Sequence, residues 1–63
     1  MTLRPYLERV CEREDLSPAD ALGAMQIILS GQASHPQIAA FLIALRMKGE
    51  TVDELVGFAR AMR

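Results

Sequence analysis

The sequence predicts an all-α protein, a small bundle of four helices at about residues 3–14, 18–30, 35–48 and 52–63 joined by short loops. Three observations favour this class. Apolar side chains recur at the spacing of amphipathic helices, and three of the four stretches follow a Ser or Thr that can cap a helix. No run of alternating β-branched residues predicts a strand. With 63 residues, the chain has room for one domain.

The first predicted helix is an amphipathic layer. Pro5 is tolerated because it falls in the first turn, where its missing N–H would have no helical partner. One face is charged, and the other carries Leu3, Tyr6, Leu7, Val10 and Cys11. We therefore expect the Cys11 thiol to be buried and inert, because a reactive thiol needs an exposed electropositive setting.

The second predicted helix begins at an explicit signal, with Ser17 as the cap, Pro18 at the first helical position and Asp20 three residues after the cap. Its predicted buried stripe consists of Ala21, Leu22, Ala24, Met25, Ile28 and Leu29. Ile27 falls about 100° from the nearest edge of that stripe. We therefore expect Ile27 to be exposed or to contact something outside this chain.

The third predicted helix has the clearest ends and is expected to be central. Ser34 and Gln37 form a capping box at its start, and Gly49 can end it in the left-handed conformation. Its large side chains share one face, which predicts a core of Ile38, Phe41, Leu42 and Leu45. On this basis Leu42→Ala would cost about 2–5 kcal/mol of folding stability.

A second apolar face of the third helix is made of smaller side chains and allows close backbone approach. A helix that is apolar nearly all round is central to a larger protein or spans a membrane, and this apolar run is too short to cross a bilayer. The face therefore predicts contact with protein outside this chain. Together with Ile27, which lies outside the buried stripe of the second helix, this face gives the candidate interface. Its residues are Ile27, Ala40, Ile43, Ala44 and Met47.

The fourth predicted helix starts at Thr51, with Glu54 at its third helical position as in a capping box. Its apolar face carries Val52, Leu55, Val56, Phe58, Ala59 and Met62. No Gly, Asn or Pro follows that would stop the helix before the sequence ends at Arg63. This is the pattern expected of a domain that continues into further sequence, with an interior that its own residues cover only in part.

No catalytic, cofactor-binding or metal-binding residue is predicted. His35 is expected to be a solvated first-turn residue, and one His with one Cys is too few for a closed zinc site. The four glycines are dispersed, so no phosphate-binding loop is present, and no acidic pair suits a magnesium ion. Arg46 and Lys48 are interpreted as cations that complement the C-terminal dipole of their helix.

Charge argues against nucleic acid as a partner, because the formal net charge is −1 and the pI is about 5.7. A helix-turn-helix formed by the third and fourth helices is the alternative, but Asp53 and Glu54 would stand where DNA contacts are made. The N-terminal residues contain no apolar targeting segment, and no stretch is long enough to cross a membrane. A cytoplasmic setting is the resulting expectation.

Several stretches resemble the N-terminal helical domain of anthranilate phosphoribosyltransferases. The similarity is carried by Ala24-Met25 through Ile28, by Ser30-Gly31, by the whole run from Gln37 to Thr51, and by Ala61-Met62-Arg63. It covers nearly all of the chain from Leu16 onward. Pyrimidine nucleoside phosphorylases have a similar small helical domain with a looser version of the pattern.

The resemblance implies that the parent protein is a glycosyltransferase that transfers a phosphoribosyl group from phosphoribosyl pyrophosphate to anthranilate, with Mg²⁺, in tryptophan biosynthesis. Residues 1–63 would then be its N-terminal domain, which packs against a catalytic α/β domain absent from this chain and contributes the homodimer contact. This chain alone is expected to be inactive and to self-associate. The alternatives are the corresponding domain of a pyrimidine nucleoside phosphorylase and a free-standing helical interaction module.

Overall fold

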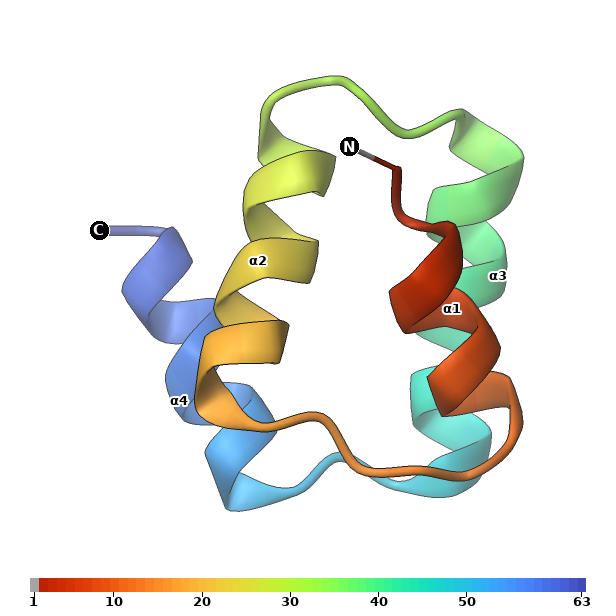
Figure 1. Cartoon of the computed structure of the whole chain (residues 1–63), viewed down its shortest axis with the longest axis vertical. Helices are drawn as coiled ribbons and strands as arrows, with labels where there is room; N and C mark the ends of the chain where they lie inside the picture. The colour runs from red at the N-terminus through yellow and green to blue at the C-terminus, as the bar shows by residue number, and fades with distance from the viewer. Residues whose placement is uncertain (1) are drawn as a thin grey trace.

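The computed structural model describes residues 2–63 and contains four helices, as the sequence predicts (Figure 1). They are α1 (Arg4–Cys11), α2 (Pro18–Leu29), α3 (His35–Lys48) and α4 (Val52–Ala61). Within the described residues there is no strand. The molecule measures 24 × 24 × 16 Å along its principal axes. The all-α prediction is confirmed.

The predicted caps form at the starts of three helices. The Ser17 side chain accepts the Asp20 N–H at α2. Both reciprocal bonds of a capping box are present for Ser34 with Gln37 at α3, and for Thr51 with Glu54 at α4. These bonds satisfy backbone N–H groups that have no partner inside the helix, which explains why the three starts are readable from the sequence.

The end of α1 differs from the prediction, because the helix stops at Cys11 instead of continuing to Glu14. Arg13 adopts the left-handed conformation at φ 63°, its N–H bonds the Val10 carbonyl, and the Glu14 N–H bonds the Arg9 carbonyl. This pair of bonds is a Schellman motif. The position usually carries glycine, so an arginine there gives no stop signal in the sequence.

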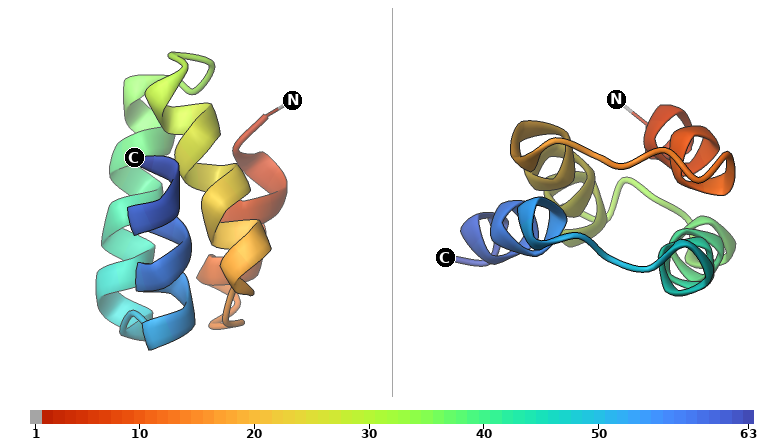
Figure 2. Two further views of the ribbon diagram at one scale, coloured as in Figure 1. Left: turned by 90° about the vertical axis from the view of Figure 1, so that its left-hand side faces the viewer. Right: turned by 90° about the horizontal axis from the view of Figure 1, so that it is seen from below.

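The four helices form two closely packed pairs, α2 with α4 and α1 with α3. Seen from below, the pairs lie on opposite sides of the interior, and each of the three loops crosses from one pair to the other (Figure 2). Between the pairs, the rings of Phe41 and Phe58 meet edge to face with their centroids 6.4 Å apart. The buried core consists of Leu3, Val10, Leu16, Ala21, Ala24, Ile27, Ala33, Phe41, Leu45 and Phe58.

Leu42 corrects the predicted core. Phe41 and Leu45 are buried, Ile38 is partly buried, and Leu42 is 51% exposed. Leu42 follows Phe41 by about 100° around the helix, which places it outside the arc that faces the interior. Because α3 is apolar nearly all round, periodicity alone does not say which arc faces inward.

Ile27 and Cys11 correct two further predictions. Ile27 is 4% exposed, whereas Leu29 is 57% exposed, so the buried stripe of α2 is rotated from the predicted one and runs through Ala21, Ala24 and Ile27. Cys11 is exposed at the last residue of α1, whereas its neighbour Val10 is buried in the core. The predictions for both residues rest on helical periodicity, which does not determine where a helix ends or which of its faces is buried.

Close packing of α2 on α4 depends on Gly57. A Cβ atom added there would overlap the Pro18 carbonyl oxygen and approach the Ala21 Cβ to 2.6 Å. We expect Gly57→Ala to destabilise the fold by about 1–3 kcal/mol through overpacking, even though alanine is the better helix former. Urea unfolding followed by circular dichroism measures the loss.

Gly23→Ala is the matched control for Gly57→Ala, because Gly23 lies inside α2 and a Cβ atom there meets only the end of the Tyr6 side chain, at 2.8 Å from its hydroxyl. That side chain can rotate away, so the gain in helix propensity is expected to offset most of the cost. Equal losses in the two variants would show that contact with α2 does not require glycine at position 57.

Candidate docking surface and buried ion pair

A fully buried carboxylate lies where three segments of the chain meet. Glu54 Oε2 accepts the Leu16 N–H from the α1–α2 loop at 2.7 Å. Glu54 Oε1 accepts the Thr51 N–H at 3.0 Å and Lys48 Nζ, from the end of α3, at 2.8 Å. The same side chain therefore completes the cap of α4 and fixes the loop that leads into α2.

Lys48 supplies the opposite charge from a side chain that is only 4% exposed. Besides Glu54, its ammonium group donates to Asp15 Oδ1 and to the Gly49 carbonyl, each at 3.0 Å. All three of its N–H donors are thus used. The sequence predicts Lys48 only as a partner of the helix dipole. Its pairing with Glu54 is not predicted, because the two residues are six apart across a turn, a spacing that no helical rule singles out.

The two charges stabilise each other against their burial. Burial raises the pKa of the Glu54 carboxyl, but the hydrogen bonds from Leu16, Lys48 and Thr51 outweigh it, so this pKa lies below its ordinary value of 4.5. Burial lowers the pKa of the Lys48 ammonium, but the bonds to Glu54 and Asp15 outweigh it, so this pKa lies above its ordinary value of 10.5.

Acid is therefore expected to weaken the fold through Glu54. A carboxyl with a depressed folded-state pKa contributes its full stability above the unfolded pKa, near 4.5, and loses it as pH falls towards the folded-state value. Urea unfolding at a series of pH values below neutrality measures this loss. Asp20, whose pKa is lowered first by its hydrogen bond from Arg9, adds a loss of the same sign.

Comparison with Glu54→Gln isolates the contribution of Glu54, because the amide does not titrate while Asp20 is unchanged. The variant is expected to lose less stability than the original chain over the same acidic range. Identical slopes in the two proteins would contradict a depressed Glu54 pKa in the folded state.

Seven large aliphatic side chains of the two C-terminal helices and their ends are exposed, and we refer to this set as the α3–α4 apolar surface. Its most exposed members include Met47 at 70% and Val52 at 75%. The members of the α3–α4 apolar surface are Leu42, Ile43, Met47, Val52, Leu55, Val56 and Met62.

The predicted interface residues divide between this surface and the interior. Ala40, Ile43 and Met47 are exposed on α3, and Ala44 is half-buried. Ile27 lies in the core, so it does not have the free surface that contact with a partner needs. Leu42 and the aliphatic residues of α4 belong to the exposed set instead, and the sequence did not single them out as such.

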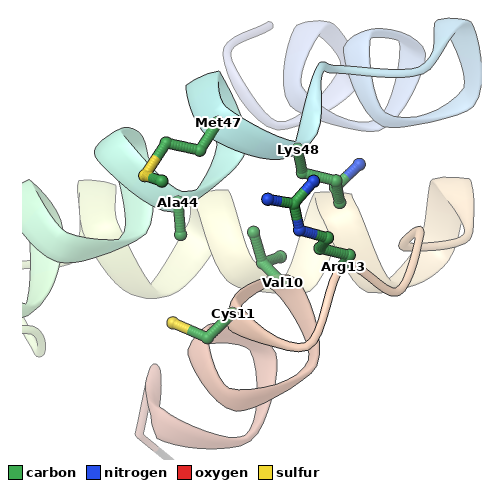
Figure 3. Close-up of a pocket in the computed structure, with 6 residues that line it drawn as sticks. All are labelled: Val10, Cys11, Arg13, Ala44, Met47 and Lys48. Atoms are coloured by element: carbon green, nitrogen blue, oxygen red, sulfur yellow. The ribbon is translucent and has the colours of Figure 1, made fainter.

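A shallow open groove of about 160 Å³ separates the C-terminal ends of α1 and α3 (Figure 3). The Lys48 ammonium at its edge is already engaged with Asp15 and Glu54. The groove combines apolar side chains with two cationic ones and contains no carboxylate or imidazole. It is lined by Val10, Cys11, Arg13, Ala44, Met47 and Lys48.

The sequence candidates for chemistry remain apart from one another among the described residues 2–63. His35 is exposed at the first position of α3. Among residues 2–63, no three His, Cys, Asp or Glu side chains gather in a way that could hold a metal ion. The helices in this part of the chain are also too short and insufficiently apolar for any of them to span a membrane.

The fold defines a small helical bundle domain in which α3 and α4 expose several large aliphatic side chains. The chain belongs to the family described as "Glycosyl transferase family, helical bundle domain", whose model matches residues 4–63. The similarity extends to individual enzymes. The anthranilate phosphoribosyltransferase of Solibacter usitatus is 73% identical over 63 residues, which is all of this chain and 18% of that protein.

Further relatives carry the same name. The anthranilate phosphoribosyltransferases of Citrifermentans bemidjiense and Moorella thermoacetica are each 54% identical over 61 residues, or 97% of this chain. The matched region is the N-terminal part of the relatives, and the chain spans less than a fifth of their length. The resemblance noted in the sequence is confirmed.

Proposed function

We propose that this chain is the N-terminal helical domain of an enzyme that transfers a phosphoribosyl group from phosphoribosyl pyrophosphate to anthranilate in cytoplasmic tryptophan biosynthesis. The observation that carries the proposal is the 73% identity, over the full 63 residues, to a protein named anthranilate phosphoribosyltransferase. The catalytic groups and the Mg²⁺ ion of the reaction would belong to the part of the enzyme outside this chain. The domain itself contributes contacts and no chemistry.

The contact role has two parts. The outer face of α3, with Ala40, Ile43 and Met47, packs against the same face of a second copy to give a homodimer. The remainder of the polypeptide, including the catalytic domain, packs against other parts of the bundle. The exposure of Ile43 and Met47, at 60% and 70%, supports such a role because burying aliphatic surface is the main source of association free energy.

A chimaera tests the activity. This chain would replace the matching N-terminal segment of the Solibacter usitatus enzyme in a bacterial strain that lacks anthranilate phosphoribosyltransferase. Growth without tryptophan is the expected result, and the unmodified relative is the positive control. A soluble chimaera that fails to restore growth would contradict the proposal.

Sedimentation of the chain tests the dimer contact. Self-association is expected, and Ile43→Lys should weaken it because a buried ammonium group without a partner is costly. Leu29→Lys is the matched control, since Leu29 is similarly exposed on α2 and outside the proposed contact. A well-folded monomer at high micromolar concentration, or equal effects of the two lysines, would exclude the α3 face as the dimer contact.

A further inference from the structure

The polar contacts between the two helix pairs gather at one end of the molecule, where α1 and α3 finish and α2 and α4 begin (Figure 1). At the opposite end, the side-chain hydrogen bonds of the described residues stay within one helix terminus, as in Ser30 with Ile27. The inter-pair polar contacts are Arg9 with Asp20, Lys48 with Asp15, Lys48 with Glu54, and the Leu16 N–H with Glu54.

Elsewhere the pairs meet through apolar side chains such as Phe41 and Phe58. Hydrophobic contact is non-directional, so it opposes separation of the pairs more strongly than it opposes sliding. Hydrogen bonds weaken steeply with angle and distance. The polar end is therefore the part of the molecule that can set how one pair sits on the other.

Glu54 is the most deeply buried residue among these polar contacts. It joins the α1–α2 loop, the end of α3 and the start of α4, and it is fully buried. Arg9 and Asp20 also link the pairs, but their side chains are 39% and 37% exposed, so solvent screens their attraction. Removal of the Glu54 charge would leave the Arg9–Asp20 and Lys48–Asp15 pairs, each with a partly or largely exposed carboxylate, and the apolar contacts.

We propose that Glu54 is a positioning residue whose carboxylate sets the placement of the α2/α4 pair on the α1/α3 pair. The α3–α4 apolar surface has members on both pairs, so its shape depends on that placement. Glu54 thereby keeps the exposed apolar residues of α3 and those of α4 in one relative arrangement.

Glu54→Gln tests the proposal with little change in volume. The amide NH₂ group cannot accept a hydrogen bond. The single amide oxygen is expected to face the two donors Lys48 and Thr51, so the Leu16 N–H loses its partner. We expect the Leu16 amide to exchange with solvent about tenfold faster or more, because this non-helical N–H is held by Glu54. Amide exchange in the middle of α2 and α3 should change much less.

Movement of the pairs is read from a nitroxide attached to Cys11, which is exposed and is the single cysteine in the chain. The label lies on the α1/α3 pair, and the whole molecule is small enough for it to affect distant amides. In Glu54→Gln, the paramagnetic broadening of α4 and α2 amides should change, whereas that of α3 amides should remain as in the original chain. Glu8→Gln is the control, because it makes the same carboxylate-to-amide change in the exposed Arg4–Glu8 pair of α1. It should leave the broadening of the α2, α3 and α4 amides unaltered.

One outcome would overturn the proposal directly, and a second would require a further variant. In the first, Leu16 exchanges faster but the broadening of α4 is unchanged, which would mean that apolar packing alone places the pairs. In the second, the variant unfolds as a whole. The double variant Lys48→Met with Glu54→Gln, which leaves no unpaired buried charge, then decides: a folded protein with displaced α2 and α4 supports positioning, and an unfolded or unshifted one excludes it.

Discussion

Glu54→Ala is expected to destabilise the folded chain by about 3–5 kcal/mol, the usual cost of removing one member of a buried ion pair. The substitution leaves the Lys48 ammonium buried without its closest partner, and it leaves the N–H groups of Leu16 and Thr51 unsatisfied. A domain of this size has a total folding free energy of about 3–9 kcal/mol. Urea unfolding followed by circular dichroism should therefore show a large drop in the midpoint, or a chain that is partly unfolded without urea.

Glu8→Ala provides the control for Glu54→Ala, because it removes a carboxylate from an exposed pair with Arg4 at 3.9 Å. Such surface pairs contribute about 0–1 kcal/mol. If the two variants were equally stable, the Glu54 network would not contribute to folding. If Glu54→Ala were more stable than the original chain, the free-energy cost of burying Glu54 would exceed the stabilisation from its hydrogen bonds and its ion pair.

Phe41→Ala is expected to cost about 3–5 kcal/mol, the usual range for loss of a buried aromatic ring. Phe41 is fully buried at the centre of α3 and meets Phe58 of the other helix pair edge to face. The change creates a cavity between the pairs and removes an aromatic contact as well. Thermal or urea unfolding of the chain measures the loss.

Leu42→Ala is the matched neighbour on the same helix. With Leu42 at 51% exposure, we expect less than about 1 kcal/mol, well below the 2–5 kcal/mol that follows from placing it in the core. The original chain and both variants should be compared at concentrations where none of them associates, because Leu42 lies on the α3–α4 apolar surface. A Leu42→Ala loss as large as that of Phe41→Ala would show that this part of α3 is covered in the folded molecule.

The sequence by itself determined the helices and most of their ends. Ser17, Ser34 and Thr51 cap α2, α3 and α4 through bonds between neighbours in the chain, so their effect is local and readable. The end of α1 was missed because Arg13 takes the left-handed position that glycine usually marks. The family was recognised from sequence because the run from Gln37 to Thr51 is specific in its order of residues, and the match over residues 4–63 confirms it.

Only the tertiary structure decided which faces of the helices are buried and which charges meet. Helices α2 and α3 are apolar on more than one side, so the positions of the neighbouring helices decide which side is buried. In α2, Ile27 is buried and Leu29 is exposed. In α3, Phe41 is buried and Leu42 is exposed. The Lys48–Glu54 pair forms across a turn, and Leu16 reaches it from a distant loop. Such contacts depend on how the helix pairs are placed, and that placement is a property of the packed chain rather than of any one segment.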